Sequence, residues 1–215
     1  MCGKFTQMLR WSELCEFADL QESMGGGPEE TATPIRLVSV IAIGADGKRK
    51  AVRMRWGLVP PGAKDPTAVK PHIHARAETI DTKPTFREAF AKRRGLVVVN
   101  SFNEGLEITP TKTEQYVLTP KDGAPIAIAV VWEHWREPLG GSLLSFAMVT
   151  VPPNALIATI TDRMPALIEP KDWPLWLGET KADLADAKAL LKSSARDLDM
   201  QRAKKPPSRT QPDLF

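Results

Sequence analysis

Cys2 is the first residue whose type and position could do chemistry. The chain opens Met-Cys-Gly-Lys-Phe, and a small residue after the initiator methionine is the usual context for methionine removal. Removal would leave an amine and a thiol on adjacent carbons of Cys2, with reference pKa values of about 8 and about 8.5. The amine could form a Schiff base with an aldehyde, and the thiol could then close a thiazolidine ring. The competing interpretation is an ordinary small residue in a first strand.

Composition restricts the class of protein. A chain of 215 residues with 42% hydrophobic residues is long enough to bury one sizeable core. Lys and Arg number 29 against 26 Asp and Glu, a balance that permits nucleic acid as a partner without demanding it. The two cysteines, Cys2 and Cys15, argue against a disulfide framework. Without a long apolar run or a secretory signal, the sequence predicts a reduced, cytoplasmic protein with no membrane partner.

Metal and cofactor sites are not expected. The sequence contains three histidines, His72, His74 and His134, and no Cys-x-x-Cys pair. Structural zinc sites usually need four such ligands at close spacing. The predicted chemistry at Cys2 also requires no cofactor.

The elements that must position these residues form a strand-rich α+β pattern. Residues 37–43 and 50–56 predict a hairpin around the turn signal Asp46-Gly47, and further strands are expected at 95–100, 115–118, 126–132 and 145–151. Helices are expected at 12–24, with Ser12 as N-cap, and at 84–94, 154–160, 171–177 and 181–191. Residues 1–201 are predicted to form one domain, and 202–215, rich in Pro and Lys, a flexible tail.

Seven linked motifs run through the chain in a fixed order. They are MCGKF at 1–5, MRWGLVP at 54–60, ARAETIDTKPTFREAF at 75–90, FNEG at 102–105, VVWEHW at 130–135, VTVPPN at 149–154 and DRMPALI at 162–168. Together they resemble the SOS-response-associated peptidase (SRAP) family of abasic-site crosslinking proteins, from Met1 to about Leu191. The resemblance implies a mixed, mostly antiparallel, barrel-like sheet with peripheral helices. It also implies covalent crosslinking to abasic sites in single-stranded DNA during the DNA damage response.

The resemblance assigns catalytic roles to two residues that match the family's motifs. Cys2 matches the family nucleophile, and Glu104 matches its catalytic glutamate. A carboxyl group there could open the deoxyribose ring and shuttle protons at the Schiff base if burial raises its pKa towards neutrality. Taken alone, Glu104 would more simply be a solvated loop carboxylate.

A second set of residues would contact DNA. Arg76 matches a family arginine that binds phosphate, a role that suits its guanidinium fork. Pro34, Trp56 and Thr150 stand where the family lines its single-strand channel, and Lys4 stands where the family usually has arginine. Trp56 could stack on a base or could be an ordinary core residue.

Two positions depart from the family pattern. His74 stands where the family has asparagine, and Thr161 stands where it has histidine. One hypothesis is that the two roles have been exchanged, with His74 supplying the imidazole and Thr161 the small hydrogen-bonding group. The competing hypothesis is a weakened enzyme.

The last five residues, QPDLF, resemble the peptide by which bacterial replication and repair proteins dock on the sliding clamp. Leu214 and Phe215 would enter an apolar pocket, and Gln211 would make hydrogen bonds. The alternative is a tail end without a binding role.

Two other functions remain open at this point. Some glutamine amidotransferases also begin Met-Cys-Gly, although their glutamine-binding motifs are not evident in this sequence. A non-catalytic module that binds single-stranded DNA through Arg76 would show salt-sensitive affinity and no covalent adduct. Within the crosslinking hypothesis, the sequence does not decide between release of the adduct and strand cleavage by β-elimination. It also leaves open whether the peptidase of the family name refers only to removal of Met1.

Overall fold

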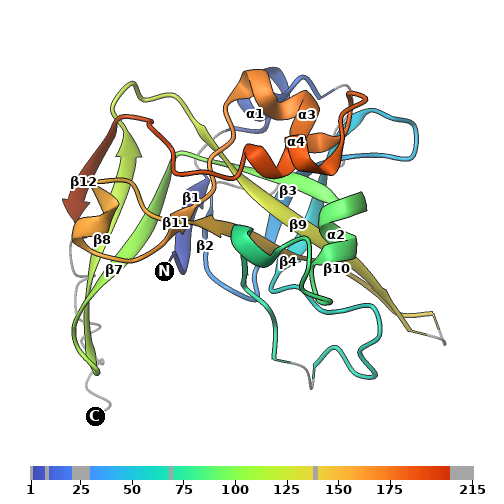
Figure 1. The fold of residues 1–215 in the computed structure, drawn as a ribbon, viewed down its shortest axis with the longest axis horizontal. Helices are drawn as coiled ribbons and strands as arrows, with labels where there is room; N and C mark the ends of the chain where they lie inside the picture. Colours follow the sequence, from blue (N-terminus) through green and yellow to red (C-terminus); the bar gives the residue numbers. More distant parts are fainter. Residues whose placement is uncertain (1, 8–9, 21–29, 68–69, 138–139, 204–215) are drawn as a thin grey trace, which may run out of the picture.

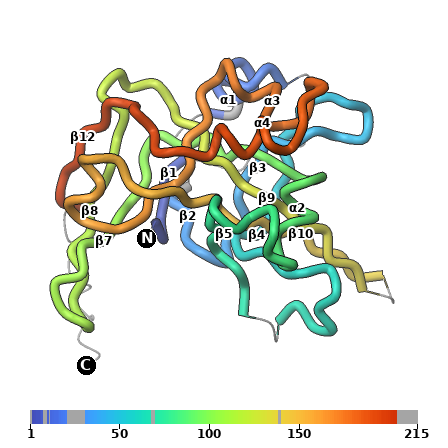
Figure 2. The backbone as a smooth tube through the Cα atoms, viewed as in Figure 1, coloured from blue at the N-terminus to red at the C-terminus, as the bar shows by residue number. Residues whose placement is uncertain are grey.

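The computed structural model describes residues 2–7, 10–20, 30–67, 70–137 and 140–203. Two β-sheets make up most of it, with short helices around them (Figures 1 and 2). The strands are β1 Lys4–Gln7, β2 Glu30–Ala32, β3 Leu37–Ile43, β4 Arg49–Trp56, β5 His74–Arg76, β6 Arg94–Val99, β7 Ser101–Thr109, β8 Lys112–Pro120, β9 Ile126–Arg136, β10 Ser142–Val151, β11 Met164–Pro165 and β12 Leu198–Arg202. The helices are α1 Trp11–Ala18, α2 Arg87–Lys92, α3 Trp173–Leu177 and α4 Leu184–Ala189, with 3₁₀ turns η1 Ala77–Thr79, η2 Ile157–Thr159 and η3 Pro170–Asp172.

Five strands of the larger sheet close into a ring in the order β10-β4-β3-β6-β9, because β9 also pairs with β10. The β10–β4 pairing is parallel and the other four are antiparallel. The short strands β5 and β11 add to the far end of β10. This arrangement confirms the predicted α+β class with a mixed, barrel-like sheet.

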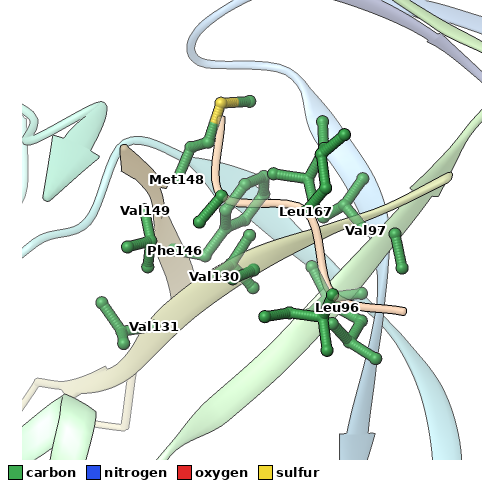
Figure 3. Packing of buried hydrophobic residues seen from close by; sticks show 14 of the residues in the cluster. Leu96, Val97, Val130, Val131, Phe146, Met148, Val149 and Leu167 are labelled. Carbon is green, nitrogen blue, oxygen red and sulfur yellow. The ribbon is translucent and has the colours of Figure 1, made fainter. Parts of the chain in front are cut away.

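The core lies where these strands meet (Figure 3). Residues 95–99 of β6 and 126–131 of β9 are buried without interruption, so these strands have continuous apolar sequences instead of alternating ones. Leu96, Val130 and Phe146 are fully buried in the cluster. At about 25 cal/mol per Å² of apolar surface removed from water, such packing is the main favourable term in folding.

The smaller sheet is antiparallel, in the order β12-β8-β7-β1-β2. In Figure 1, β7, β8 and β12 lie on one side of the molecule, and α1, α3 and α4 gather at one end. The strand β1 pairs with β7 through Lys4↔Asn103 and Phe5↔Phe102. This pairing brings the beginning of the chain against the FNEG segment.

The predicted hairpin at 37–43 and 50–56 is confirmed, but several elements differ from expectation. The strands β1, β2, β5, β7, β11 and β12 were not predicted. Helix α1 ends at Ala18, short of the predicted Met24, because Asp19 adopts a left-handed conformation with φ 52°. The expected helix at 154–160 is only the 3₁₀ turn η2, where the Asn154 Oδ1 accepts the backbone N–H of Ile157. The C-terminal end of the helix predicted at 12–24, residues 21–24, lies outside the described residues.

At the C-terminal side, the described fold continues slightly past the predicted domain boundary at residue 201. Strand β12 includes Arg202, and the backbone N–H of Ala203 donates to the Gln115 carbonyl at 2.7 Å. None of the helices in the described part of the chain has the length and apolar content needed to cross a bilayer.

Candidate active site

Cys2 and Glu104 come together through strand pairing. Because Lys4 is opposite Asn103, the same antiparallel register continued by one residue brings Gly3 opposite Glu104. Cys2 therefore lies at the end of β1 beside this carboxylate. Both side chains are buried, Cys2 completely and Glu104 with 1% of its surface exposed. The simple alternative of a solvated loop carboxylate is thus wrong for Glu104, which belongs to the middle of β7.

Burial raises the pKa of Glu104 to about 7. The negative charge of Asp162 acts in the same direction, and a backbone hydrogen bond at Cys2 acts against it. A carboxyl group with this pKa exchanges its proton readily near neutrality, which is the property required of a general acid that later serves as a base.

The thiol of Cys2 is not activated as a thiolate. Burial raises its pKa well above the ordinary value, and the charge of Glu104 raises it further. The Sγ lies 3.4 Å from the Lys4 carbonyl oxygen, to which it donates a hydrogen bond. In this environment the thiol is protonated at neutral pH, so it carries its own proton into any addition reaction.

His74 holds the backbone of the candidate nucleophile. Its Nε2 lies 2.6 Å from the carbonyl oxygen of Cys2. Since a carbonyl can only accept, Nε2 carries the hydrogen, and in the neutral ring Nδ1 is then the basic nitrogen. Burial lowers the pKa of His74, which favours this neutral form, although the hydrogen bond to Cys2 partly opposes the shift.

Thr161 lies in the segment between the turn η2 and strand β11. It follows the turn η2, and its backbone N–H donates to the Ile157 carbonyl at 3.0 Å. The charge of its neighbour Asp162 acts on Glu104. Of the two positions that depart from the family pattern, His74 contacts the Cys2 backbone, and Thr161 directly precedes a residue whose charge acts on Glu104.

The predicted phosphate contact is at the surface. Arg76 is exposed, and it lies opposite Thr150 in the parallel pairing of β5 with β10. Thr150 itself is buried with 1% exposed, so its side chain is not on the surface. Its carbonyl accepts a 2.6 Å hydrogen bond from Nη2 of Arg163.

Arg163 is a buried residue on the Arg76 side of the molecule to which the sequence alone assigned no role. This buried guanidinium forms a two-pronged ion pair with the carboxylate of Glu78, including an Nη2–Oε2 distance of 2.9 Å. The pair lowers the pKa of Glu78 and ties the turn after Arg76 to β10. The only sequence signal was an arginine inside the DRMPALI motif.

The remaining predicted DNA contacts differ in exposure. Lys4 is exposed and Pro34 is half-buried. Trp56 is fully buried, its Nε1 donates to the Ile73 carbonyl at 3.0 Å, and its ring lies parallel to that of Phe146. In this arrangement no base can stack on Trp56, so of its two interpretations the core one fits the structure.

Two further predictions concern metals and the tail. In the described ranges, no group of three or more His, Cys, Asp or Glu side chains is arranged to hold a metal ion. Gln211, Leu214 and Phe215 lie outside the described residues, so clamp binding stays a prediction.

Comparison with known proteins gives the family. A model of the family described as SOS response associated peptidase (SRAP) matches residues 1–206. The chain belongs to the SRAP family. Among relatives of this SRAP chain, the abasic site processing protein YoqW of Bacillus subtilis (strain 168) is 30% identical over 187 residues, which cover 85% of this chain and 83% of YoqW. The abasic site processing protein HMCES of Xenopus tropicalis is 23% identical over 171 residues, or 69% of this chain and 51% of HMCES.

Solved structures show the same SRAP fold at lower identity. A crystal structure of a protein from Bacteroides thetaiotaomicron superposes with a TM-score of 0.82 at 21% identity, covering 95% of this chain and 93% of that one. A protein from Bordetella bronchiseptica superposes with a TM-score of 0.80 at 23% identity, covering 94% of this chain and all of that one.

Proposed function

We propose that this SRAP chain processes abasic sites in single-stranded DNA by forming a covalent adduct through Cys2 after removal of Met1. The observation that carries the proposal is the buried carboxyl group of Glu104 beside the first strand, with its pKa raised to about 7. The names of its relatives, abasic site processing proteins, support the same substrate.

The first chemical step is opening of the abasic sugar. An abasic deoxyribose is a cyclic hemiacetal in equilibrium with a ring-opened aldehyde. Glu104 in its neutral form can protonate the ring oxygen as the bond to C1′ breaks, while the anomeric hydroxyl loses its proton and becomes the aldehyde oxygen. A carboxyl group at its ordinary pKa would be almost fully ionised at neutral pH and could not donate this proton.

Two bonds to C1′ then form in succession. The α-amine of Cys2 adds to the aldehyde, and loss of one water molecule gives the imine. The S–H of Cys2 adds across the C=N bond, with sulfur bonding to carbon and the proton passing to nitrogen. The net reaction is aldehyde plus aminothiol giving thiazolidine plus water, so no oxidant or cofactor is needed. The raised pKa of the thiol fits this order, because the amine is the stronger nucleophile when the thiol is protonated.

Crosslinking of processed protein to abasic single-stranded DNA tests the proposal. Denaturing electrophoresis and intact mass spectrometry should show a heat-stable adduct whose mass is that of the protein plus DNA minus one water. Cys2→Ala should form no such adduct, and Cys15→Ala, the matched cysteine control, should react normally. If no adduct forms while DNA binding is retained, the chain is a non-catalytic binding module. Release of ammonia from glutamine would instead favour an amidotransferase.

A further inference from the structure

Ile35 is held in a conformation that its residue type disfavours. Its φ of 75° lies in the left-handed region, which is costly for a β-branched side chain. Two backbone hydrogen bonds hold the loop in this shape: Ile35 N–H donates to the Trp56 carbonyl at 2.8 Å, and Trp56 N–H donates to the Arg36 carbonyl at 2.9 Å. The isoleucine is nevertheless 51% exposed, so burial does not offset the strain.

Leu37 lies next to this strained residue and is also 51% exposed. In the described part of the chain only Ile108 and Leu184 are comparably exposed large apolar residues, and they belong to β7 and α4. We call the exposed side chains of Ile35 and Leu37 the Ile35–Leu37 ledge. Packing within the described fold does not explain why these two apolar side chains stand exposed at this place.

The loop that carries the ledge leads towards the Cys2 end of β1, where the candidate active site lies. Strand β2 pairs antiparallel with β1 through Phe5↔Ala32, so the chain after Ala32 runs towards the Cys2 end of β1. Trp56, which holds the loop by its backbone, packs its ring 4.9 Å from that of Phe5 and 6.3 Å from that of His74.

The surroundings of the ledge are cationic. Residues 31–45 and 47–64, which include both strands of the hairpin beside it, contain no Asp or Glu. Arg36 is exposed, and Leu37 is the direct cross-strand neighbour of Arg55. Burial lowers the pKa of Arg55, and its buried Nε has no hydrogen-bond partner among the described residues. An apolar surface bordered by two arginines is complementary to a nucleobase with its phosphates.

We propose that the Ile35–Leu37 ledge binds the nucleobase adjacent to the abasic site, with Arg36 and Arg55 neutralising the neighbouring phosphates. This assignment rests on the proposed function for its substrate, and it adds a binding subsite that Cys2, Glu104 and His74 do not provide. A base held against the ledge would fix the position of the adjoining sugar, which itself has no base by which it could be recognised.

Equilibrium binding in a Cys2→Ala background tests the ledge separately from the chemistry. The probes are two single-stranded oligonucleotides with a central tetrahydrofuran abasic analogue, one with ordinary flanking bases and one with baseless residues on both sides. Ile35→Gly and Leu37→Thr remove the apolar side chains and suit the local backbone. Ile108→Thr removes a side chain of similar exposure on β7 and serves as control.

Ile35→Gly/Leu37→Thr should weaken binding of the base-containing strand about tenfold and leave binding of the baseless strand unchanged. The slope of affinity against salt concentration should stay the same, because no phosphate contact is removed. The melting temperature of Ile35→Gly should not fall, since glycine adopts positive φ without strain.

Affinity equal to that of Ile108→Thr on the base-containing strand, or equal losses on both strands, would overturn the assignment. Self-association that disappears in Leu37→Thr would overturn it in favour of a contact between two copies of the chain. Failure of the covalent chemistry is detected separately, as absence of an adduct with Cys2 intact.

Discussion

Glu104 owes its chemical character to its place in β7. The same residue in a surface loop would ionise near its ordinary pKa of 4.5, whereas burial raises the pKa to about 7. The pKa of His74 moves in the opposite direction for the same reason, since burial always disfavours the charged form. A carboxyl group that titrates near neutral pH and an imidazole that burial keeps neutral lie beside Cys2, so the site can both donate and accept protons near neutral pH.

The raised pKa of Glu104 makes a prediction about stability. Between pH 4.5 and about 7 the folded state binds more protons than the unfolded state, so the free energy of unfolding falls as pH rises through this window. The loss is on the order of 3 kcal/mol and is complete above the folded pKa. Glu104→Gln does not titrate and should gain stability relative to wild type across the same window. Urea unfolding at several pH values measures this; a constant difference would contradict the pKa assignment.

His74 and Thr161 permit a sharper test of exchanged roles. His74→Ala removes the hydrogen bond to the Cys2 carbonyl and should slow crosslinking about 10²-fold, a usual loss for a proton-transfer group. If the roles are exchanged, His74→Asn should also be slow, and His74→Asn/Thr161→His should recover most of the rate. Single-turnover crosslinking and release rates provide the measurement. Unchanged rates in His74→Ala would remove His74 from the mechanism.

At the scale of elements, the turn after β4 positions both the active site and the Ile35–Leu37 ledge. Gly57 follows Trp56 with a φ of 129°, and its N–H donates to the Phe146 carbonyl at 2.8 Å. A Cβ here would lie 2.8 Å from the Cβ of Pro71, closer than side chains tolerate. Glycine is therefore required at this position both for its backbone conformation and for its lack of a side chain.

Gly57→Ala should destabilise the protein by about 2 kcal/mol through strained backbone and crowding against Pro71. Gly62→Ala is the matched control, because no atom lies within 4 Å of its Cβ position and its φ is not positive. Chemical denaturation should show a lower midpoint for the first variant and little change for the second. Equal effects would mean that neither the backbone conformation of Gly57 nor the contact with Pro71 carries the cost.

At the scale of the whole molecule, the site depends on both sheets. The smaller sheet supplies Cys2 and Glu104 through β1 and β7, and the larger sheet supplies His74 and Arg76 through β5 at the end of β10. Trp56 joins them, because it lies in the larger sheet and packs on Phe5 of the smaller one. The proposed chemistry at Cys2 therefore requires both sheets.

The QPDLF peptide of the tail predicts clamp binding that is separable from the chemistry of the domain. Deleting residues 211–215 should leave crosslinking to abasic DNA unchanged, because the site residues lie in the domain. The same deletion should abolish binding to purified sliding clamp if the QPDLF peptide is a docking segment. Surface plasmon resonance with immobilised clamp measures the difference, and Leu214→Ala/Phe215→Ala is the point-variant equivalent. Clamp binding that survives the deletion would refute the assignment.

The sequence by itself determined the family and the α+β class, since linked motifs can be identified without coordinates, and it supplied Cys2 and Glu104 as candidate site residues. The hairpin at 37–56 was also predictable, because its turn residues and apolar strands are local signals. The long-range pairings were not. Strands β1, β5 and β12 are short, and nothing in their local sequence specifies the distant partner that makes them strands.

Only the tertiary structure decided how the site residues behave. Burial depends on which elements pack together. Long-range packing therefore sets the raised pKa of Glu104, the burial of the Trp56 ring and the ion pair of the Arg163 guanidinium with Glu78. The strained, exposed Ile35 is also a tertiary feature, because its positive φ is fixed by hydrogen bonds to Trp56, a residue distant in sequence. Residue types restrict the possible chemistry, and their three-dimensional surroundings set the protonation and exposure on which that chemistry depends.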